Sequence, residues 1–148
     1  MNPTAADDPR LLALRQFYES LQPSDLARLG QLYTEQAFFK DPFNEVRGLL
    51  AIRAIFAHMF EALEAPRFEV REAFAQGDQG FLSWDVHFRL KGKNSPQCIH
   101  GSSHLRFAPD GRVDYHRDYW DAAEELYEKL PVLGGLLRWI KKRLQVTA

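Results

Sequence analysis

The chain has 148 residues, of which 45% are hydrophobic and 26% are charged, so a single compact globular domain is expected. Nineteen Lys and Arg against twenty Asp and Glu leave a formal charge of −1, which offers no electrostatic footprint for a nucleic-acid backbone. One cysteine, Cys98, no signal-like start and no run of ~20 apolar residues indicate a cytoplasmic protein that does not cross a membrane.

The first elements are expected to be helical. Leucines and aromatic residues at three- and four-residue spacing over residues 11–21 predict an amphipathic helix that ends near Pro23. Ser24 or Asp25 is a natural N-cap for a short second helix that carries apolar residues as far as Tyr33. The two helices are expected to form a hairpin.

A short strand and the clearest helix of the chain come next. Residues 37–40 are aromatic and run into Asp41 and Pro42, where the proline biases Asp41 toward an extended conformation and ends the strand. After a loop, residues 49–63 trace a long helical stripe that ends before Pro66.

Beyond this helix the hydrophobic period changes to two, which indicates an antiparallel meander. Residues 68–73 alternate in polarity, and residues 77–80 supply a turn. Longer strands are then expected at residues 81–90, 97–107 and 112–120. In the first of these, Trp84 and Val86 share one face while Asp85 and His87 share the other.

The end of the chain predicts two helical segments. Asp121 is a natural N-cap for a helix that runs to Leu130, and Pro131 interrupts it. Residues 133–144 continue at helical spacing, with four cations among the apolar positions. This last segment is expected to dock over a pocket mouth or a partner subunit, and contact with an anionic membrane surface is the less favoured alternative.

Three helices, a short strand and a long sheet make an α+β layer in which the helices cover one face of the sheet. Several short fragments recur in a characteristic order, namely Phe17-Tyr18, Ser24-Asp25-Leu26, Leu32-Tyr33, residues 37–42, Val46-Arg47-Gly48 and residues 52–56, 84–88, 103–107, 109–113 and 119–120. With these fragments in this order, the sequence resembles the nuclear transport factor 2-like superfamily, and within it the SnoaL-like and ketosteroid-isomerase-like proteins.

The resemblance implies a cone in which three N-terminal helices pack on a curved antiparallel or mixed sheet. Residues 1–148 would form one domain, with residues 122–148 as a helical C-terminal extension. It also implies a homodimer through the outer sheet face, which the alternation predicts to be polar and rich in histidine, with Asp85, His87, Arg89, His100, Ser102, His104 and Arg106.

The resemblance assigns a catalytic role to Asp41. In ketosteroid isomerases the aspartate of an Asp-Pro pair after the first strand is the proton-shuttling base, and that pattern falls on Asp41 and Pro42. The positions of their oxyanion-hole donors fall on Phe17 and Ser103, so both donors are altered. The alternative for Asp41 is a structural one, in which its side chain accepts backbone N–H bonds in the following turn.

The last strand carries a second group of candidates. Period two places His116, Asp118 and Trp120 on one face, which the resemblance identifies as the pocket face. SnoaL-like cyclases and limonene epoxide hydrolases use an acidic residue from a late strand, and Asp118 is its counterpart. In the alternative, His116 and Asp118 form a salt-bridged outer surface. The expected pocket lining is Phe17, Tyr18, Phe56, Phe60, Trp84, Val86, Ser103 and Trp120.

No metal or cofactor is expected. His100 and His104 share a strand face but lie ~13 Å apart, and the scattered glycines form no phosphate loop. The leading hypothesis is a cofactor-free isomerase, cyclase, dehydratase or epoxide hydrolase that acts on a small hydrophobic cyclic substrate through Asp41, His116 and Asp118. The alternative is a non-catalytic module of the same fold that binds a small ligand or a protein.

Overall fold

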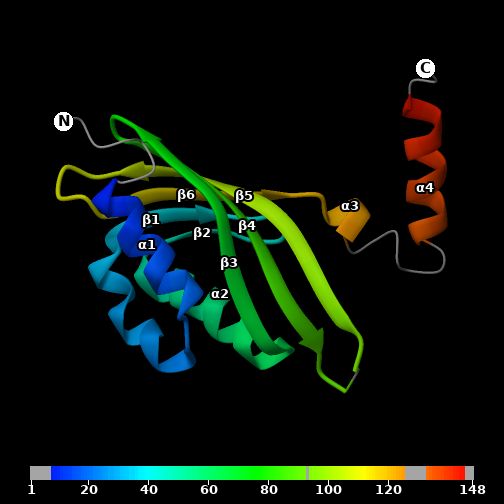
Figure 1. Cartoon of the computed structure of the whole chain (residues 1–148), viewed down its shortest axis with the longest axis horizontal. Coiled ribbons are helices and arrows are strands. Elements are labelled where there is room, and N and C mark those ends of the chain that lie inside the picture. Colours follow the sequence, from blue (N-terminus) through cyan, green and yellow to red (C-terminus); the bar gives the residue numbers. More distant parts are fainter. Residues whose placement is uncertain (1–7, 93, 126–132, 146–148) are drawn as a thin grey trace.

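The computed structural model describes residues 8–92, 94–125 and 133–145, and it has the expected α+β architecture (Figure 1). The elements in chain order are α1 (Pro9–Glu19), the 3₁₀ helix η2 (Pro23–Gln31), β1 (Tyr33–Lys40), β2 (Glu45–Arg47), α2 (Leu49–Ala62), β3 (Leu63–Gln76), β4 (Gln79–Leu90), β5 (Pro96–Phe107), β6 (Val113–Trp120), α3 (Ala122–Glu125) and α4 (Leu133–Leu144).

The strands form one mixed six-stranded sheet in the order β2-β1-β6-β5-β4-β3. β1 runs parallel to β6, and the other neighbours are antiparallel. The long strands β3, β4 and β5 curve, and α1, η2 and α2 lie together on one side of the sheet (Figure 1). The parallel register sets Phe39 beside His116 and Lys40 beside Arg117, which brings the end of β1 next to the polar part of β6.

Local sequence explains where the two main helices begin. The side chain of Asp8 accepts the backbone N–H of Arg10 at 2.9 Å, and Pro9 occupies the first turn of α1. α2 follows Gly48, whose φ of 101° favours glycine. The apolar faces of the two helices meet the sheet in one core, to which they contribute Leu11, Leu14, Phe17, Tyr18, Ile52 and Phe56.

Several boundaries differ from the sequence-based expectation. The second helix is 3₁₀ and stops at Gln31, so Tyr33 opens β1. α2 ends at Ala62 because Leu63 is already extended and begins β3 directly. Residues 45–47 form a short strand where a loop was expected.

The C-terminal helical segments are described in part. α3 covers the start of the helix expected after Asp121, whereas its remainder as far as Leu130 lies outside the described residues. α4 matches the expected segment, and Trp139 and Leu144 are exposed on it. Among the described residues, no helix combines the length and apolar character that a bilayer span requires.

Two residues of α2 test where the core lies. Ile52 is fully buried, and Leu50, two positions earlier, is 79% exposed. We expect Ile52→Ala to lower the free energy of unfolding by about 2–5 kcal/mol, because the lost side chain leaves a cavity between α2 and the sheet. Leu50→Ala should change it by less than about 0.5 kcal/mol. Urea unfolding followed by circular dichroism measures both, and equal losses would contradict this packing.

Candidate functional site

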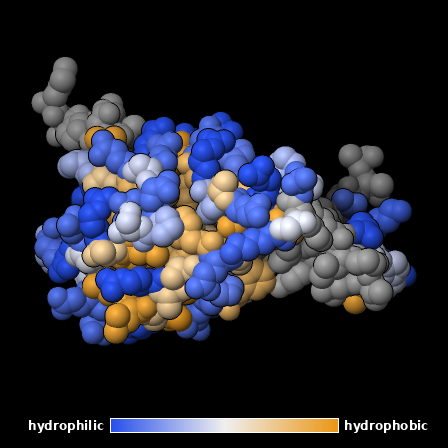
Figure 2. Space-filling view, turned by 90° about the horizontal axis from the view of Figure 1, so that it is seen from below, coloured by the Kyte–Doolittle hydropathy of each residue, from blue (hydrophilic) through white to orange (hydrophobic). Residues whose placement is uncertain are grey.

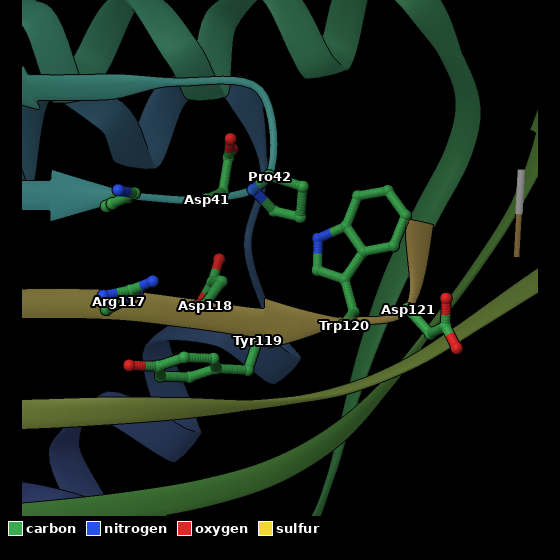
Figure 3. Close-up of a pocket in the computed structure, with 8 residues that line it drawn as sticks. Asp41, Pro42, Arg117, Asp118, Tyr119, Trp120 and Asp121 are labelled. Carbon is green, nitrogen blue, oxygen red and sulfur yellow. The ribbon is translucent and has the colours of Figure 1, made fainter. Parts of the chain in front are cut away.

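A cleft opens at the edge between β1 and β6, because β1 stops at Lys40 while β6 continues to Trp120. Its volume is about 450 Å³ (Figure 3). The indole of Trp120 stands at one side, where the ring of Phe43 meets it edge-on at 5.5 Å between ring centroids. The residues that line the cleft are Lys40, Asp41, Pro42, Arg117, Asp118, Tyr119, Trp120 and Asp121.

Asp118 and His116 point inward and are bonded to each other. His116 is 3% exposed, and its Nε2 lies 2.6 Å from Asp118 Oδ1. The hydroxyl of Ser103 donates to the same carboxylate oxygen at 2.5 Å. The side chain of Asp118 is 19% exposed and lines the cleft. One side of this carboxylate is therefore hydrogen-bonded to the core, and the other is accessible from the cleft.

The hydrogen bonds continue into the core on both sides of this pair. On one side, Trp84 donates its indole N–H to Ser103 Oγ at 2.9 Å. On the other, the hydroxyl of Tyr33 lies 2.8 Å from His116 Nδ1, and the hydroxyl of Tyr18 bonds to that of Tyr33.

Burial settles the state of the two phenols. It raises the pKa of Tyr18 and of Tyr33 well above the usual value of 10.0. Both phenols therefore remain protonated. A carboxylate only accepts hydrogen bonds, so the imidazole presents Nε2–H to Asp118, and in the neutral imidazole Nδ1 accepts from the hydroxyl of Tyr33. These hydrogen-bonded groups come from four strands and one helix, and together they orient the carboxylate of Asp118.

Asp41 closes a turn in this structure. Its Oδ1 accepts the backbone N–H groups of Phe43 at 2.8 Å and Asn44 at 2.7 Å, and the side-chain amide of Asn44 bonds to both carboxylate oxygens. Such an Asx turn ends β1 and reverses the chain toward β2. Asp41 lines the cleft beside Asp118 but, unlike Asp118, is engaged by its own loop (Figure 3).

Most residues expected to line the pocket belong to the core. Of the eight, only Trp120 lines the cleft. Phe60 is partly buried, and the other six are buried where the helices close on the sheet: Phe17, Tyr18, Phe56, Trp84, Val86 and Ser103. The expectation of an apolar pocket between helices and sheet therefore stays a prediction. Tyr18 and Ser103 instead support Asp118 through hydrogen bonds.

The sequence analysis missed two residues that this arrangement needs. Tyr33 looked like part of a helical stripe, although it contacts His116 directly. Gly101 pairs with Trp84 on one side and Trp120 on the other. A Cβ at Gly101 would lie 2.5 Å from the Trp84 ring, so only glycine lets this indole reach Ser103.

The buried phenols predict an alkaline signature. Above pH 10.0 the unfolded chain loses phenolic protons that buried Tyr18 and Tyr33 keep, so stability falls as the pH rises. Tyr18→Phe removes one of these groups and should reduce the slope by up to about 1.4 kcal/mol per pH unit. Urea unfolding of both proteins between about pH 9 and about pH 11 measures the slopes, and identical slopes would contradict a raised pKa of Tyr18.

The sequence profile of the SnoaL-like domain matches residues 14–116. A comparison with curated proteins gives no match. Solved structures share the fold, among them a hypothetical protein with a ketosteroid isomerase-like fold from Catenulispora acidiphila in complex with trimethylamine (TM-score 0.68, 18% identity, 80% of this chain and 89% of that chain).

Two further structures are similar over most of their length. One is an LEH-like epoxide hydrolase from M. tuberculosis (TM-score 0.66, 16% identity, 90% of this chain and 96% of that one). The other is TerC co-crystallised with polyporic acid (TM-score 0.68, 16% identity, 79% and 95%). These likenesses confirm the expected fold, and the profile match extends from α1 to His116. The chain belongs to the SnoaL-like domain family.

Proposed function

We propose that the chain is a cofactor-free enzyme that acts by general acid/base chemistry on a small hydrophobic cyclic substrate in the β1–β6 cleft. The observation that carries this proposal is Asp118, a carboxylate fixed by His116 and Ser103 and facing the cleft. Trp120 and Pro42 supply apolar surface for a ring beside it. A positioned carboxylate next to an apolar wall is the arrangement that proton transfer at carbon requires.

In this proposal Asp118 is the catalytic base and His116 is a positioning residue. Asp118 takes a proton from the carbon next to a carbonyl group, the C–H electron pair forms an enolate, and the same carboxyl group returns the proton to another atom. With an epoxide, the carboxylate would instead take a proton from the attacking water. Arg117 and Lys40 line the same cleft and would stabilise the negative charge that develops on oxygen.

We assign the base to Asp118 rather than to Asp41, because the Asx turn already occupies the carboxylate of Asp41. Both hydrogen bonds of Asp118 go to Oδ1, and within the described ranges none reaches Oδ2. Oδ2 is therefore the oxygen that we assign to accept the proton of the substrate.

The fold neighbours support a small organic substrate, since one is an epoxide hydrolase and another was crystallised with polyporic acid. A non-catalytic binding module is the second candidate. Phe17 has no hydroxyl and the hydroxyl of Ser103 is committed to Asp118, so neither can bind an oxyanion. A protein that only binds its ligand would have no need of such donors.

We further propose a cytoplasmic homodimer formed through the outer sheet face. Five ring side chains form a continuous row across β3, β4, β5, β6 and β1, with centroid separations of 4.6 to 5.4 Å: Phe74, Phe81, His104, Tyr115 and Phe38. Phe74 is 51% exposed, and an exposed aromatic row of this kind is typical of a subunit interface.

Hydrogen exchange at carbon tests the proposed proton transfer by Asp118 directly. The full chain is incubated in D₂O with a panel of enolisable cyclic ketones, and deuterium incorporation next to the carbonyl group is followed by NMR. We expect exchange with at least one member, and a loss of about 100-fold or more in Asp118→Asn, whose amide keeps the shape but is not a base. Epoxide opening is followed in parallel by mass spectrometry.

Asp41→Asn is the matched control, because an asparagine side chain also closes an Asx turn. It should retain exchange within about threefold of the wild type. Equal exchange rates in the wild type and Asp118→Asn would overturn the role of Asp118. A panel member that binds tightly without exchange or opening would favour the binding module.

A further inference from the structure

A second cluster of chemically reactive side chains lies on the outer face of the sheet, away from the cleft. Asp85 and His87 alternate onto this face of β4, and Cys98 and His100 do the same on β5. The antiparallel register pairs Asp85 with His100 and His87 with Cys98. Four residues with metal-ligand side chains therefore occupy the corners of one square on adjacent strands.

The ligand atoms of three of these residues are already close together. One atom each from Asp85, His87 and Cys98 lies within 4.8 Å of the others. Ligands of a tetrahedral zinc ion stand about 2.0–2.3 Å from the metal, and hence roughly 3.3–3.8 Å from one another. Side-chain rotations of about 1 Å would close the difference. We propose that Asp85, His87 and Cys98 bind a zinc ion on the outer face of the sheet.

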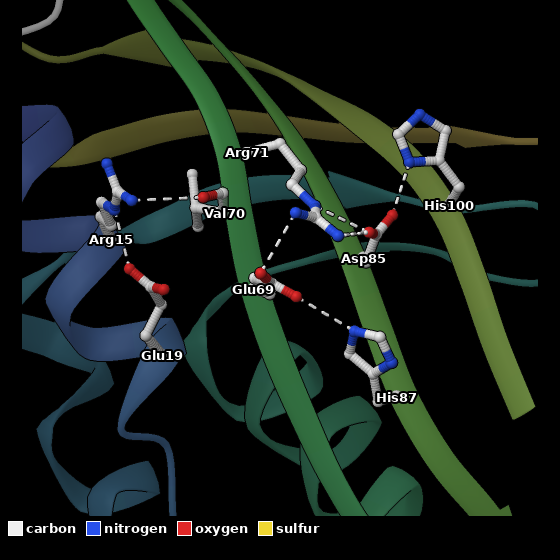
Figure 4. Close-up of polar contacts among 8 residues, drawn as sticks. All are labelled: Arg15, Glu19, Glu69, Val70, Arg71, Asp85, His87 and His100. Atoms are coloured by element: carbon white, nitrogen blue, oxygen red, sulfur yellow. Dashed lines mark hydrogen bonds and ion pairs between the residues drawn. The ribbon is translucent and has the colours of Figure 1, made fainter. Parts of the chain in front are cut away.

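The surrounding hydrogen bonds constrain which atoms bind the metal (Figure 4). Glu69 lies 3.2 Å from Nε2 of His87, which leaves Nδ1 as the ligand, as in the carboxylate-histidine pairs that orient zinc ligands. Arg71 donates to Oδ2 of Asp85, and Nδ1 of His100 lies 2.6 Å from Oδ1. This last separation is too short for two ligands of one zinc ion, so His100 would give up its hydrogen bond when Oδ1 binds the metal, and its side chain would then supply the fourth ligand.

Charge and access also fit a divalent cation. With Cys98 as a thiolate, Asp85, Glu69 and Cys98 carry three negative charges, against the guanidinium of Arg71 and that of Arg67, which is the β3 partner of His87. The net negative charge favours a cation, and zinc would displace the thiol proton of Cys98. Asp85 is buried and Cys98 is exposed, so the ion would enter from the side of β5.

The set of nitrogen, sulfur and oxygen ligands is typical of zinc, and a site filled by protein ligands is structural rather than catalytic. Zinc here would join β4 to β5 on the face that also carries the aromatic row. The sequence-based expectation of no metal weighed the histidines of these strands, whereas this cluster also takes in Asp85 and Cys98.

Competition with a chromophoric chelator tests the proposal on the full chain, reduced and stripped of metal. We expect one zinc ion per chain, and affinities at least tenfold weaker in Cys98→Ser and His87→Gln. His104→Gln is the matched control, because His104 lies on the same face of β5 but outside the cluster, and it should bind zinc like the wild type. Circular dichroism without metal verifies that each variant is folded.

Cobalt provides an independent readout of the ligands. Co²⁺ added to the stripped protein should give a thiolate-to-metal absorption band that is absent in Cys98→Ser. Less than one equivalent of zinc in the wild type, or the same affinity in the wild type, Cys98→Ser and His87→Gln, would overturn the site.

Discussion

A carboxylate that lies between the core and an open cleft needs hydrogen-bond donors on its buried side, because an unpaired buried charge is strongly destabilising. Asp118 receives two donors, His116 from its own strand and Ser103 from the next. The second nitrogen of His116 then needs a partner of its own, which is the hydroxyl of Tyr33. The hydroxyl of Tyr33 is bonded in turn to the hydroxyl of Tyr18 in α1, which is the last member of this chain of groups.

This chain of groups constrains the fold as well as the site. It passes through β4, β5, β6, β1 and α1, and it includes the parallel pair of β1 and β6. A register slip of one residue in any of these strands would turn a member to the opposite face and break the chain. Gly101 has the same dependence, since it makes room for Trp84 only in the observed register.

The two aspartates of the cleft have different effects. Asp41 closes the turn that ends β1, and the early end of β1 opens the cleft beside β6. Asp118 lies in the opening and keeps one oxygen toward it. One carboxylate therefore shapes the cleft and the other is available for proton transfer, which is why the proposed chemistry is assigned to the late strand.

The strand alternation and the family resemblance were sufficient to predict the α+β fold and the common face of His116, Asp118 and Trp120. They could not predict Tyr33, because its partner His116 is 83 positions away and its local pattern continues a helical stripe. They left Asp41 open between a catalytic base and a residue that closes the following turn, and the structure shows the turn. The outer cluster at Asp85 and Cys98 depends on the β4–β5 register, which local sequence patterns do not define.

The central claim is that Tyr33 and Asp118 fix the imidazole of His116 from both sides. Nitrogen-15 NMR of the five histidines at neutral pH tests it, with the His116 signals assigned by their loss in His116→Gln. The account predicts one tautomer for His116, with the proton on Nε2 and with Nδ1 accepting a hydrogen bond. A proton on Nδ1, or the averaged shifts of a freely exchanging imidazole, would contradict it.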